Sequence, residues 1–225
     1  MRSGSNLIII SDVHSNLYAL EAVLSKVSNE NKIVHAGDIV GYYTFPNEVV
    51  SIFKRKNIIS IRGNHDRALL SENYFNFNEY AISALKWTQE KISKEALIYL
   101  YSIRDSIKLN VFGKRIAIYH GAPWDNDYYL MEEEALETII PEGIDILILG
   151  HTHIPFVKRY GNKMIINPGS VGQPRDGDPR ASFAILTPDM EVRLERVEYD
   201  IDSVKNSMKN ENLPDFLWKR LYRGF

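Results

Sequence analysis

The sequence contains no cysteine, no excess of charge of either sign and no long hydrophobic run. Without cysteine, the chain has no disulfides, thiolate zinc sites, iron–sulfur clusters or cysteine nucleophiles. Its 27 basic and 29 acidic side chains give a net charge of −2, which argues against bulk electrostatic attraction to nucleic acid. No segment approaches the roughly 18 apolar residues of a membrane helix, and residues 1–6 lack the apolar core of a signal peptide. We therefore expect a cytoplasmic protein with no membrane partner.

The remaining composition is that of an ordinary folded chain. Hydrophobic residues make up 44% and charged residues 25% of the 225 positions. A chain of this length can bury a sizeable core without covalent staples. We therefore expect residues 1–225 to form a single domain.

Short runs of aliphatic residues predict buried strands. These runs cover residues 7–10, 33–36, 58–61, 116–119 and 146–149. Apolar residues at helical spacing predict helices over 17–27, with Ser15 or Asn16 as N-cap, and over 46–56. The alternation of strands and helices predicts an α/β fold with parallel pairing.

The middle of the chain has a helical pattern. Consecutive amphipathic helices are predicted over 78–91 and 93–103, within a helical insertion at approximately 70–108. A further helix is predicted over 132–140, where three acids would occupy the first turn.

The last third of the chain returns to a strand pattern. A hairpin turn is predicted at 187–189 and a helical segment from 202 to 225, broken at Pro214. The predicted strands cover residues 164–166, 182–186 and 192–199.

Residues that can bind metal follow each of the first five strand runs. In open α/β sheets, ligands bind beyond the carboxyl ends of the strands. Asp12 and His14 are separated by one residue, so in extended backbone both point to the same side, and the same holds for His151 and His153. The candidate metal ligands are Asp12, His14, Asp38, Asn64, His120, His151 and His153.

Seven oxygen and imidazole donors are too many for one zinc-like ion. They suit two ions about 3.5–4 Å apart that share a carboxylate, an arrangement used on phosphate esters. Several imidazoles and no sulfur favour Mn, Fe, Zn, Co or Ni over Mg or Ca. A single motif would be weak evidence, but five in order contain five of the six histidines. His35, inside a predicted strand, is interpreted as a packed structural residue.

The motifs resemble those of the calcineurin-like metallophosphoesterases. The matching segments are Asp12-Val13-His14, Gly37-Asp38, Gly63-Asn64-His65-Asp66, His120-Gly121 and Gly150-His151-Thr152-His153. Residues 167–175 extend the resemblance to small prokaryotic phosphodiesterase-like members. The resemblance implies an α/β fold, a four-layer αββα sandwich of two mixed sheets.

The resemblance also implies a role for each motif residue. Two divalent ions would be bound, with manganese as the first candidate. One would be held by Asp12, His14 and His153, and the other by Asn64, His120 and His151. Asp38 would bridge the two ions. His65 would be the general acid, oriented by Asp66, and not a ligand. The two ions would lower the pKa of a bridging water, and the resulting hydroxide would attack phosphorus in line. His35 and Tyr43 depart from the residues usual in the family.

Substrate contacts are open to two interpretations. Asn64, Arg175 and Arg180 are candidates for gripping a phosphate, although solvated loop arginines are equally common. Tyr42, Tyr43 and Trp124 would form an aromatic rim for a base or would pack against the helical insertion.

The favoured activity is hydrolysis of a phosphodiester, with a small phosphate ester or nucleotide as substrate. Phosphomonoesterase, protein phosphatase and dinucleoside polyphosphate hydrolase share the same site chemistry. A non-catalytic binding scaffold would show broken ligand positions, and here all are present. A nuclease would need basic tracts, which the sequence lacks. The helical insertion would cap the site or form a homodimer surface.

Overall fold

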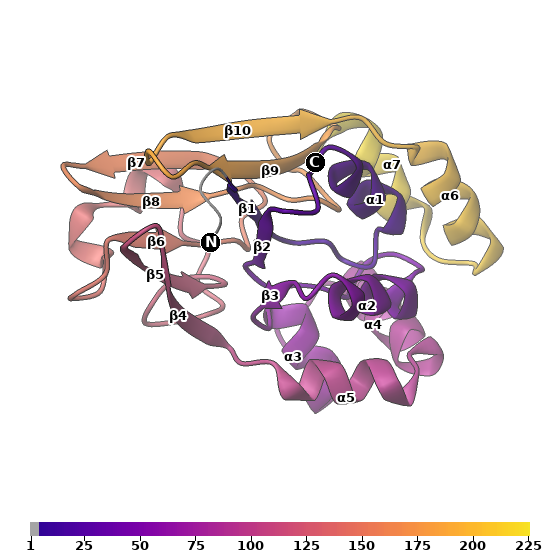
Figure 1. Cartoon of the computed structure of the whole chain (residues 1–225). Coiled ribbons are helices and arrows are strands. Elements are labelled where there is room, and N and C mark those ends of the chain that lie inside the picture. The colour runs from indigo at the N-terminus through magenta and orange to yellow at the C-terminus, as the bar shows by residue number, and fades with distance from the viewer. Residues whose placement is uncertain (1–4) are drawn as a thin grey trace.

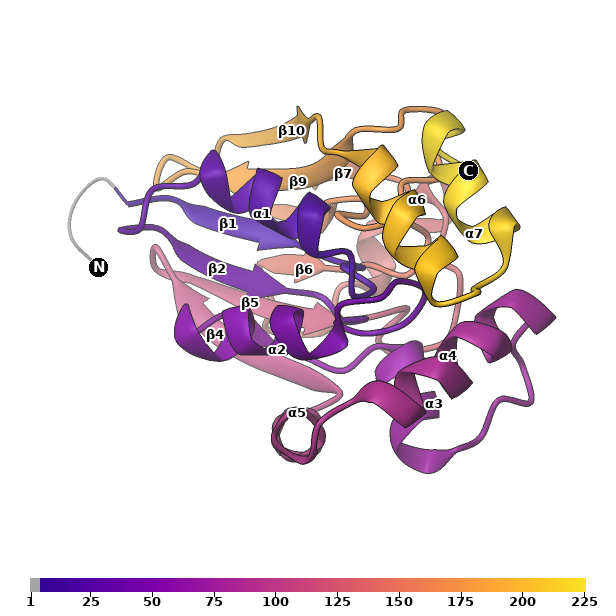
Figure 2. The ribbon, with the colours of Figure 1, turned by 90° about the vertical axis from the view of Figure 1, so that its right-hand side faces the viewer.

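The structure, a computed structural model describing residues 5–225, contains two five-stranded sheets that face each other (Figure 1, Figure 2). The first sheet has the order β10 (Val192–Val197), β9 (Ala181–Leu186), β1 (Leu7–Ile10), β2 (Lys32–His35), β3 (Ile59–Ser60). The second has the order β4 (Ser106–Val111), β5 (Lys114–Tyr119), β6 (Ile146–Ile148), β8 (Lys163–Asn167), β7 (Phe156–Tyr160). The predicted architecture of two mixed sheets is confirmed. The polar start, predicted over 1–6, lies mostly outside the described residues.

Both sheets combine parallel and antiparallel strands, with antiparallel pairing on one side of the first sheet and at both edges of the second. β1, β2 and β3 pair in parallel, as do β5, β6 and β8. β9 and β10 form an antiparallel hairpin, which confirms the predicted turn at 187–189, and β4 and β7 pair antiparallel with β5 and β8. Parallel neighbours end at the same edge of a sheet, so their following loops lie together.

β1 shows why the predicted strands read as continuous apolar runs. Leu7 and Ile9 belong to the hydrophobic core between the two sheets. Ile8 and Ile10 belong to the core on the opposite face of the first sheet, among helices. Because successive side chains point to opposite faces, a strand buried on both sides is apolar at every position.

Helices cover the outer face of the first sheet and gather at one end of the sandwich. α1 (Leu17–Ser25), α2 (Pro46–Arg55) and α5 (Lys94–Ser102) contribute to the core on that outer face. α3 (Asn64–Ser71), α4 (Glu79–Lys91), α6 (Ile201–Asn210) and α7 (Asp215–Lys219) lie at the end seen on the right of Figure 2. No helix in residues 5–225 is long and apolar enough to cross a membrane.

The structure corrects several predicted elements. The helix predicted over 132–140 is wrong: only 3₁₀ turns form there, at Glu132–Glu134 and Glu137–Ile139. Its first three residues are acidic and Leu136 is exposed, so a helix there would have no continuous apolar stripe to bury. α3 was not predicted at all, because it begins inside the motif at Asn64.

Two edge strands were also missed. β4 alternates polar and apolar side chains, and β7 contains Lys158 and Arg159; both strands lie at sheet edges and are partly exposed, so neither contains a long apolar run. The helical insertion consequently ends earlier than residue 108, since α5 ends at Ser102 and β4 begins at Ser106.

Asn16 joins the start of α1 to the loop after β8. Its side-chain oxygen accepts a hydrogen bond from the Ala19 N–H at 3.2 Å, and its amide donates to the Gly172 carbonyl at 2.9 Å. We predict that Asn16→Ala lowers the free energy of unfolding by about 1–3 kcal/mol, because it removes a helix cap and leaves a buried carbonyl unpaired. Urea unfolding measures the change. Asn29→Ala, on the exposed surface, should change it by less than about 0.5 kcal/mol; equal losses in the two variants would contradict this role.

Candidate metal centre

The seven predicted ligands meet where strands of both sheets end. Asp12 and His14 follow β1, Asp38 follows β2, and His120 directly follows β5. His151 and His153 follow β6, and Asn64 is the first residue of α3. All except the half-buried Asn64 are buried, with 3% exposure at most.

The backbone at these residues differs from the prediction. Asp12, His14, His151 and His153 have φ values of 54°, 50°, 67° and 61°, so neither pair lies in extended backbone. Asp38 shares this left-handed conformation, with φ of 64°. The pairs converge through left-handed turns, which cost free energy for residues other than glycine and are concentrated at functional sites.

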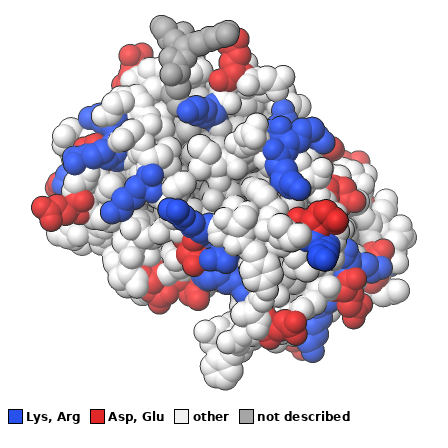
Figure 3. Space-filling view, turned by 60° about the horizontal axis from the view of Figure 1, so that its bottom comes forward, with Lys and Arg blue, Asp and Glu red and all other residues white. Residues whose placement is uncertain are grey.

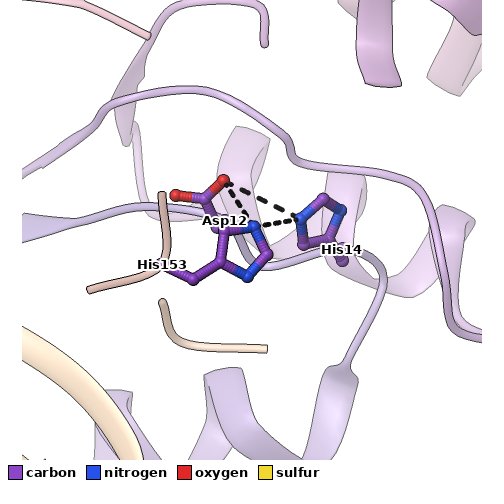
Figure 4. Close-up of side chains that lie close together, drawn as sticks. All are labelled: Asp12, His14 and His153. Carbon is purple, nitrogen blue, oxygen red and sulfur yellow. Dashed lines mark hydrogen bonds and ion pairs between the residues drawn. The ribbon is translucent and has the colours of Figure 1, made fainter. Parts of the chain in front are cut away.

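The first donor group consists of Asp12, His14 and His153, whose side chains point toward one another in Figure 4. His153 Nε2 lies 3.2 Å from both Asp12 Oδ1 and His14 Nε2. His14 Nε2 is 3.8 Å from the same carboxylate oxygen. These three residues can therefore offer one oxygen and two nitrogens to a single cation.

The second donor group consists of Asp38, His120 and His151. His120 Nε2 is 3.3 Å from Asp38 Oδ2 and 2.9 Å from Asn64 Oδ1. Asp38 Oδ2 also lies 3.6 Å from His14 Nε2, which belongs to the first group. Asp38 is thus positioned between the two groups, where a bridging carboxylate would have to be.

The start of α3 determines where Asp38 points. Asp38 Oδ1 accepts a hydrogen bond from the His65 N–H at 2.9 Å, in the first turn of the helix, where the helix dipole favours a carboxylate. Asp38 Oδ2 remains directed at the histidines. Only glycine fits at position 63, because a Cβ there would lie 2.0 Å from Asp38 Oδ1.

Backbone carbonyls determine which nitrogen of three histidines carries the proton. His120 Nδ1 lies 2.7 Å from the Ala36 carbonyl, and His153 Nδ1 is 2.5 Å from the Gln173 carbonyl. His151 Nε2 lies 3.0 Å from the Asp127 carbonyl. A carbonyl can only accept, so each of these nitrogens is a donor. The other ring nitrogen is therefore free to bind a metal.

The carboxylate oxygens and the unprotonated ring nitrogens of the two donor groups are all acceptors, so a positive charge is needed between them. A neutral His120 would direct its Nε2 lone pair at the Asp38 carboxylate, which is repulsive. Burial by itself lowers the pKa of His120, but the Asp38 carboxylate outweighs burial and raises it to about 9. Asp12 Oδ1, which faces the first group, is buried without a hydrogen-bond partner in residues 5–225. The residues therefore fit divalent cations, which would replace the proton.

Asp66 does not orient His65, contrary to the prediction. Its carboxylate accepts hydrogen bonds from the backbone N–H groups of Asp38, Ile39, Val40 and Gly63, at 3.0–3.2 Å. Both oxygens are thereby occupied, and among the described residues His65 Nδ1 has no hydrogen-bond partner. Asp66 instead holds the loop that carries Asp38 against the start of α3.

His65 lies beside the metal ligands. Its ring centroid is 4.7 Å from that of His14 and 4.6 Å from that of Tyr42. Burial lowers the pKa of His65 to about 4. It is also close enough to His14 and Asp38 for a third group of metal donors, so distance alone does not separate an acid from a ligand.

His35 lies apart from these groups. It packs edge-on against Phe53, and its Nδ1 is 2.8 Å from the Ser60 hydroxyl. It belongs to none of the candidate metal groups, which agrees with its interpretation as a structural residue.

The predicted substrate contacts separate into two sets. Tyr42 and Arg175 lie together near the site, where Arg175 Nη2 is 3.2 Å from the Tyr42 hydroxyl. Arg180 is exposed and pairs with Asp178, outside the cavity that adjoins the metal ligands, so its predicted role is not supported. Tyr43 is 0% exposed and cannot be part of a rim.

A cavity of about 710 Å³ adjoins the second donor group, with Asn64, His65, His151 and Tyr42 in its wall. Sequence reasoning missed its other principal residues, among them Phe77, Tyr129 and Arg67. Phe77 packs edge-on against His65 at 4.8 Å, and Tyr129 lies 3.9 Å from the His151 ring. Arg67 pairs with Asp127, whose carbonyl holds His151.

The exposed Trp124, also considered as a rim residue, packs on Tyr128 and does not line this cavity. No motif spacing indicates the contacts of Phe77, Tyr129 and Arg67, since Arg67 lies in α3 and the two aromatic residues lie in separate loops.

Comparison with known proteins identifies the family. Residues 6–191 match the calcineurin-like phosphoesterase superfamily domain. The chain belongs to this family. It is 37% identical to an uncharacterised protein of Methanocaldococcus jannaschii, over 98% of both chains. It is 27% identical to the phosphodiesterase YfcE of Escherichia coli, over 82% of this chain and 88% of that protein.

Solved structures agree with this calcineurin-like membership. A metallophosphoesterase from Sphaerobacter thermophilus superposes with a TM-score of 0.82 at 34% identity, covering 99% of this chain and 100% of that one. A hypothetical protein from Pyrococcus horikoshii gives a TM-score of 0.89 at 23% identity, over 98% and 99% of the chains, and supports the fold alone. Family membership implies divalent metal ions, for which the His and Asp groups above are the candidate ligands.

Asp38 lies between the two donor groups, 3.6 Å from His14 in the first and 3.3 Å from His120 in the second, so its loss should affect both metal positions. We predict that Asp38→Ala, reconstituted with Mn²⁺ and desalted, retains less metal per chain than the wild type by elemental analysis. Asp145→Ala, which removes a carboxylate bonded to Arg115 on the surface, should retain the wild-type ratio. An unchanged ratio in Asp38→Ala would exclude a bridging position for this carboxylate.

Proposed function

We propose that this calcineurin-like phosphoesterase is a phosphodiesterase that depends on two divalent metal ions. The observation that carries the proposal is the pair of donor groups that meet at one Asp38 carboxylate oxygen, 3.6 Å from His14 and 3.3 Å from His120. The names of relatives such as the Escherichia coli phosphodiesterase support hydrolysis of diesters. A non-catalytic scaffold is disfavoured because every ligand position is present and the positions lie together.

The residues divide between two metal positions. One ion would be held by Asp12, His14 and His153, the other by Asn64, His120 and His151, with Asp38 shared. Manganese is the first candidate, because carboxylate, amide and imidazole donors without sulfur suit it, while Fe, Zn, Co and Ni remain alternatives for the test. Such a pair supplies an activated water near neutral pH and charge stabilisation for the phosphoryl oxygens.

Polar side chains around the ions would position the phosphate. Arg175 is half-buried, bonded to Tyr42 and to Gln173, whose carbonyl holds His153. A guanidinium so anchored can donate to phosphate oxygens in a defined direction. Asn64 would contact both metal and phosphate from the start of α3.

His65 would donate a proton to the departing alkoxide. In the free protein burial keeps it neutral, since its pKa is about 4. An anionic phosphate ester beside it favours the protonated form, so the proton would arrive with substrate binding. The P–O bond to the alcohol breaks as the His65 proton moves to the alcohol oxygen. General-acid catalysis of this kind contributes about 10²–10⁴-fold.

A panel of phosphate esters tests the proposed activity. We predict that the Mn²⁺-reconstituted chain hydrolyses bis-p-nitrophenyl phosphate with a higher kcat/KM than p-nitrophenyl phosphate or a dinucleoside polyphosphate, and that a chelator abolishes the activity. Faster cleavage of the monoester or of the polyphosphate would assign the protein to that class instead. No metal-dependent hydrolysis of any ester would favour a binding scaffold.

His65 is tested separately through its leaving-group dependence. We predict that His65→Ala keeps wild-type metal content but loses about 10²–10⁴-fold in kcat on unactivated alkyl esters, and less on p-nitrophenyl esters, which need no proton to depart. Elemental analysis distinguishes the acid from a third ligand. Loss of metal, or wild-type turnover of alkyl esters, would refute the general-acid role.

A further inference from the structure

The cavity beside the metal centre extends well beyond the phosphate position. Its volume of about 710 Å³ lies within the range of about 300–1,000 Å³ typical of small-molecule sites. Its wall includes Asn64, His65 and His151 and also residues of the segment 71–78, which runs from the end of α3 to the start of α4. A bound phosphate ester could therefore extend one of its ester groups into the cavity.

The walls are rich in aromatic rings. Tyr129 and Phe77 line the cavity in contact with His151 and His65, and Phe75 and Tyr101 also line it. Phe75 is 91% exposed, which is unusual for a phenylalanine. Exposed rings at the wall of a cavity provide stacking faces for a planar ligand.

Side-chain amides alternate with the rings. Asn73, Asn76 and Asn78 line the same wall as Phe75 and Phe77. The Asn78 side-chain oxygen caps α4, and that of Asn73 accepts from the Phe75 N–H. Asn76 has no side-chain hydrogen bond to any residue within 5–225 and is exposed, so its amide is available. An amide can both donate to and accept from the edge of a heteroaromatic base.

The cations of this cavity are already neutralised. Arg62 donates to both carboxylate oxygens of Asp105 at 2.9 and 3.1 Å, and Arg67 pairs with Asp127. No lysine lines the cavity among the described residues. A second phosphate would find no unpaired cation here, which disfavours a polyphosphate. The surface carrying α3 and α5 also mixes both signs of charge, as Figure 3 shows, which disfavours a long polynucleotide.

We propose that this cavity binds the nucleoside of a nucleotide phosphodiester, with the base stacked on Phe75 and its edge hydrogen-bonded by Asn76. The inference rests on the proposed phosphodiesterase function and specifies its substrate class. Aromatic faces, an unpaired amide and internally compensated charge together suit an uncharged, planar, heteroaromatic group attached to a single phosphate.

Binding without turnover tests the cavity independently of catalysis. Adenosine and ribose are titrated into the full chain in the presence of a chelator, with protein-observed NMR as the readout. Adenosine should bind at least about tenfold more tightly than ribose, and Phe75→Ala should weaken adenosine binding about tenfold, the effect expected for loss of base stacking. Asn76→Ala should weaken it as well. Phe216→Ala, which removes an exposed ring outside the cavity, should bind adenosine like the wild type.

Hydrolysis then tests whether bound nucleosides are part of substrates. The ratio of kcat/KM for adenylyl-adenosine to that for methyl p-nitrophenyl phosphate should fall about tenfold in Phe75→Ala and stay at the wild-type value in Phe216→Ala. Equal binding of adenosine and ribose, or an unchanged ratio in Phe75→Ala, would overturn the nucleoside assignment while leaving the phosphodiesterase proposal intact. Adenosine binding without hydrolysis of any ester would instead refute the proposed function.

Discussion

Four backbone N–H groups converge on the buried carboxylate of Asp66, and the geometry of the candidate metal centre depends on this convergence. It ties the loop after β2 to the start of α3. Asp38 is on that loop, and Asn64 and His65 are in that first turn. The His65 N–H then holds one oxygen of Asp38, which directs the other between the two donor groups. A single carboxylate that binds only backbone thus places three side chains of the site.

The centre is built from groups that repel one another in the absence of a cation. Carboxylate oxygens and imidazole lone pairs lie within 3.2–3.8 Å, buried, on loops with left-handed backbone. The two sheets can hold this arrangement because the apolar core between them is formed by the strands that lead into these loops. Stability supplied by the core offsets the cost of the strained, charged site, and that site is where divalent cations would bind most strongly.

Prediction from sequence succeeded where the physical signal was local. Strands buried on both faces, such as β1, show as unbroken apolar runs, and Asn16, one of the two predicted caps, marks the start of α1. Prediction failed where secondary structure depended on the position of a segment in the fold. β4 and β7 were missed because they lie at sheet edges, and the helix predicted from Glu132 does not form because that stretch lacks an apolar stripe. The role of Asp66 was misassigned because its neighbour in sequence, His65, is not its partner in space. Arg180 was misassigned for a different reason: its partner Asp178 is only two residues away, and the fold leaves this pair exposed and outside the cavity.

The amino-acid sequence was sufficient for the fold class and for the candidate metal-ligand set, because each candidate lies within a few residues of the end of a buried strand and the spacing is local. Tertiary structure alone decided that Asp38 lies between the donor groups and which histidine nitrogens face the site, because both depend on backbone groups distant in the chain. The lining of the cavity beside the candidate ligands was likewise visible only in the folded structure. Phe75 and Asn76 lie between α3 and α4, Arg67 lies in α3 and Tyr129 lies in the loop after β5, so the cavity wall arises from packing that no single segment encodes.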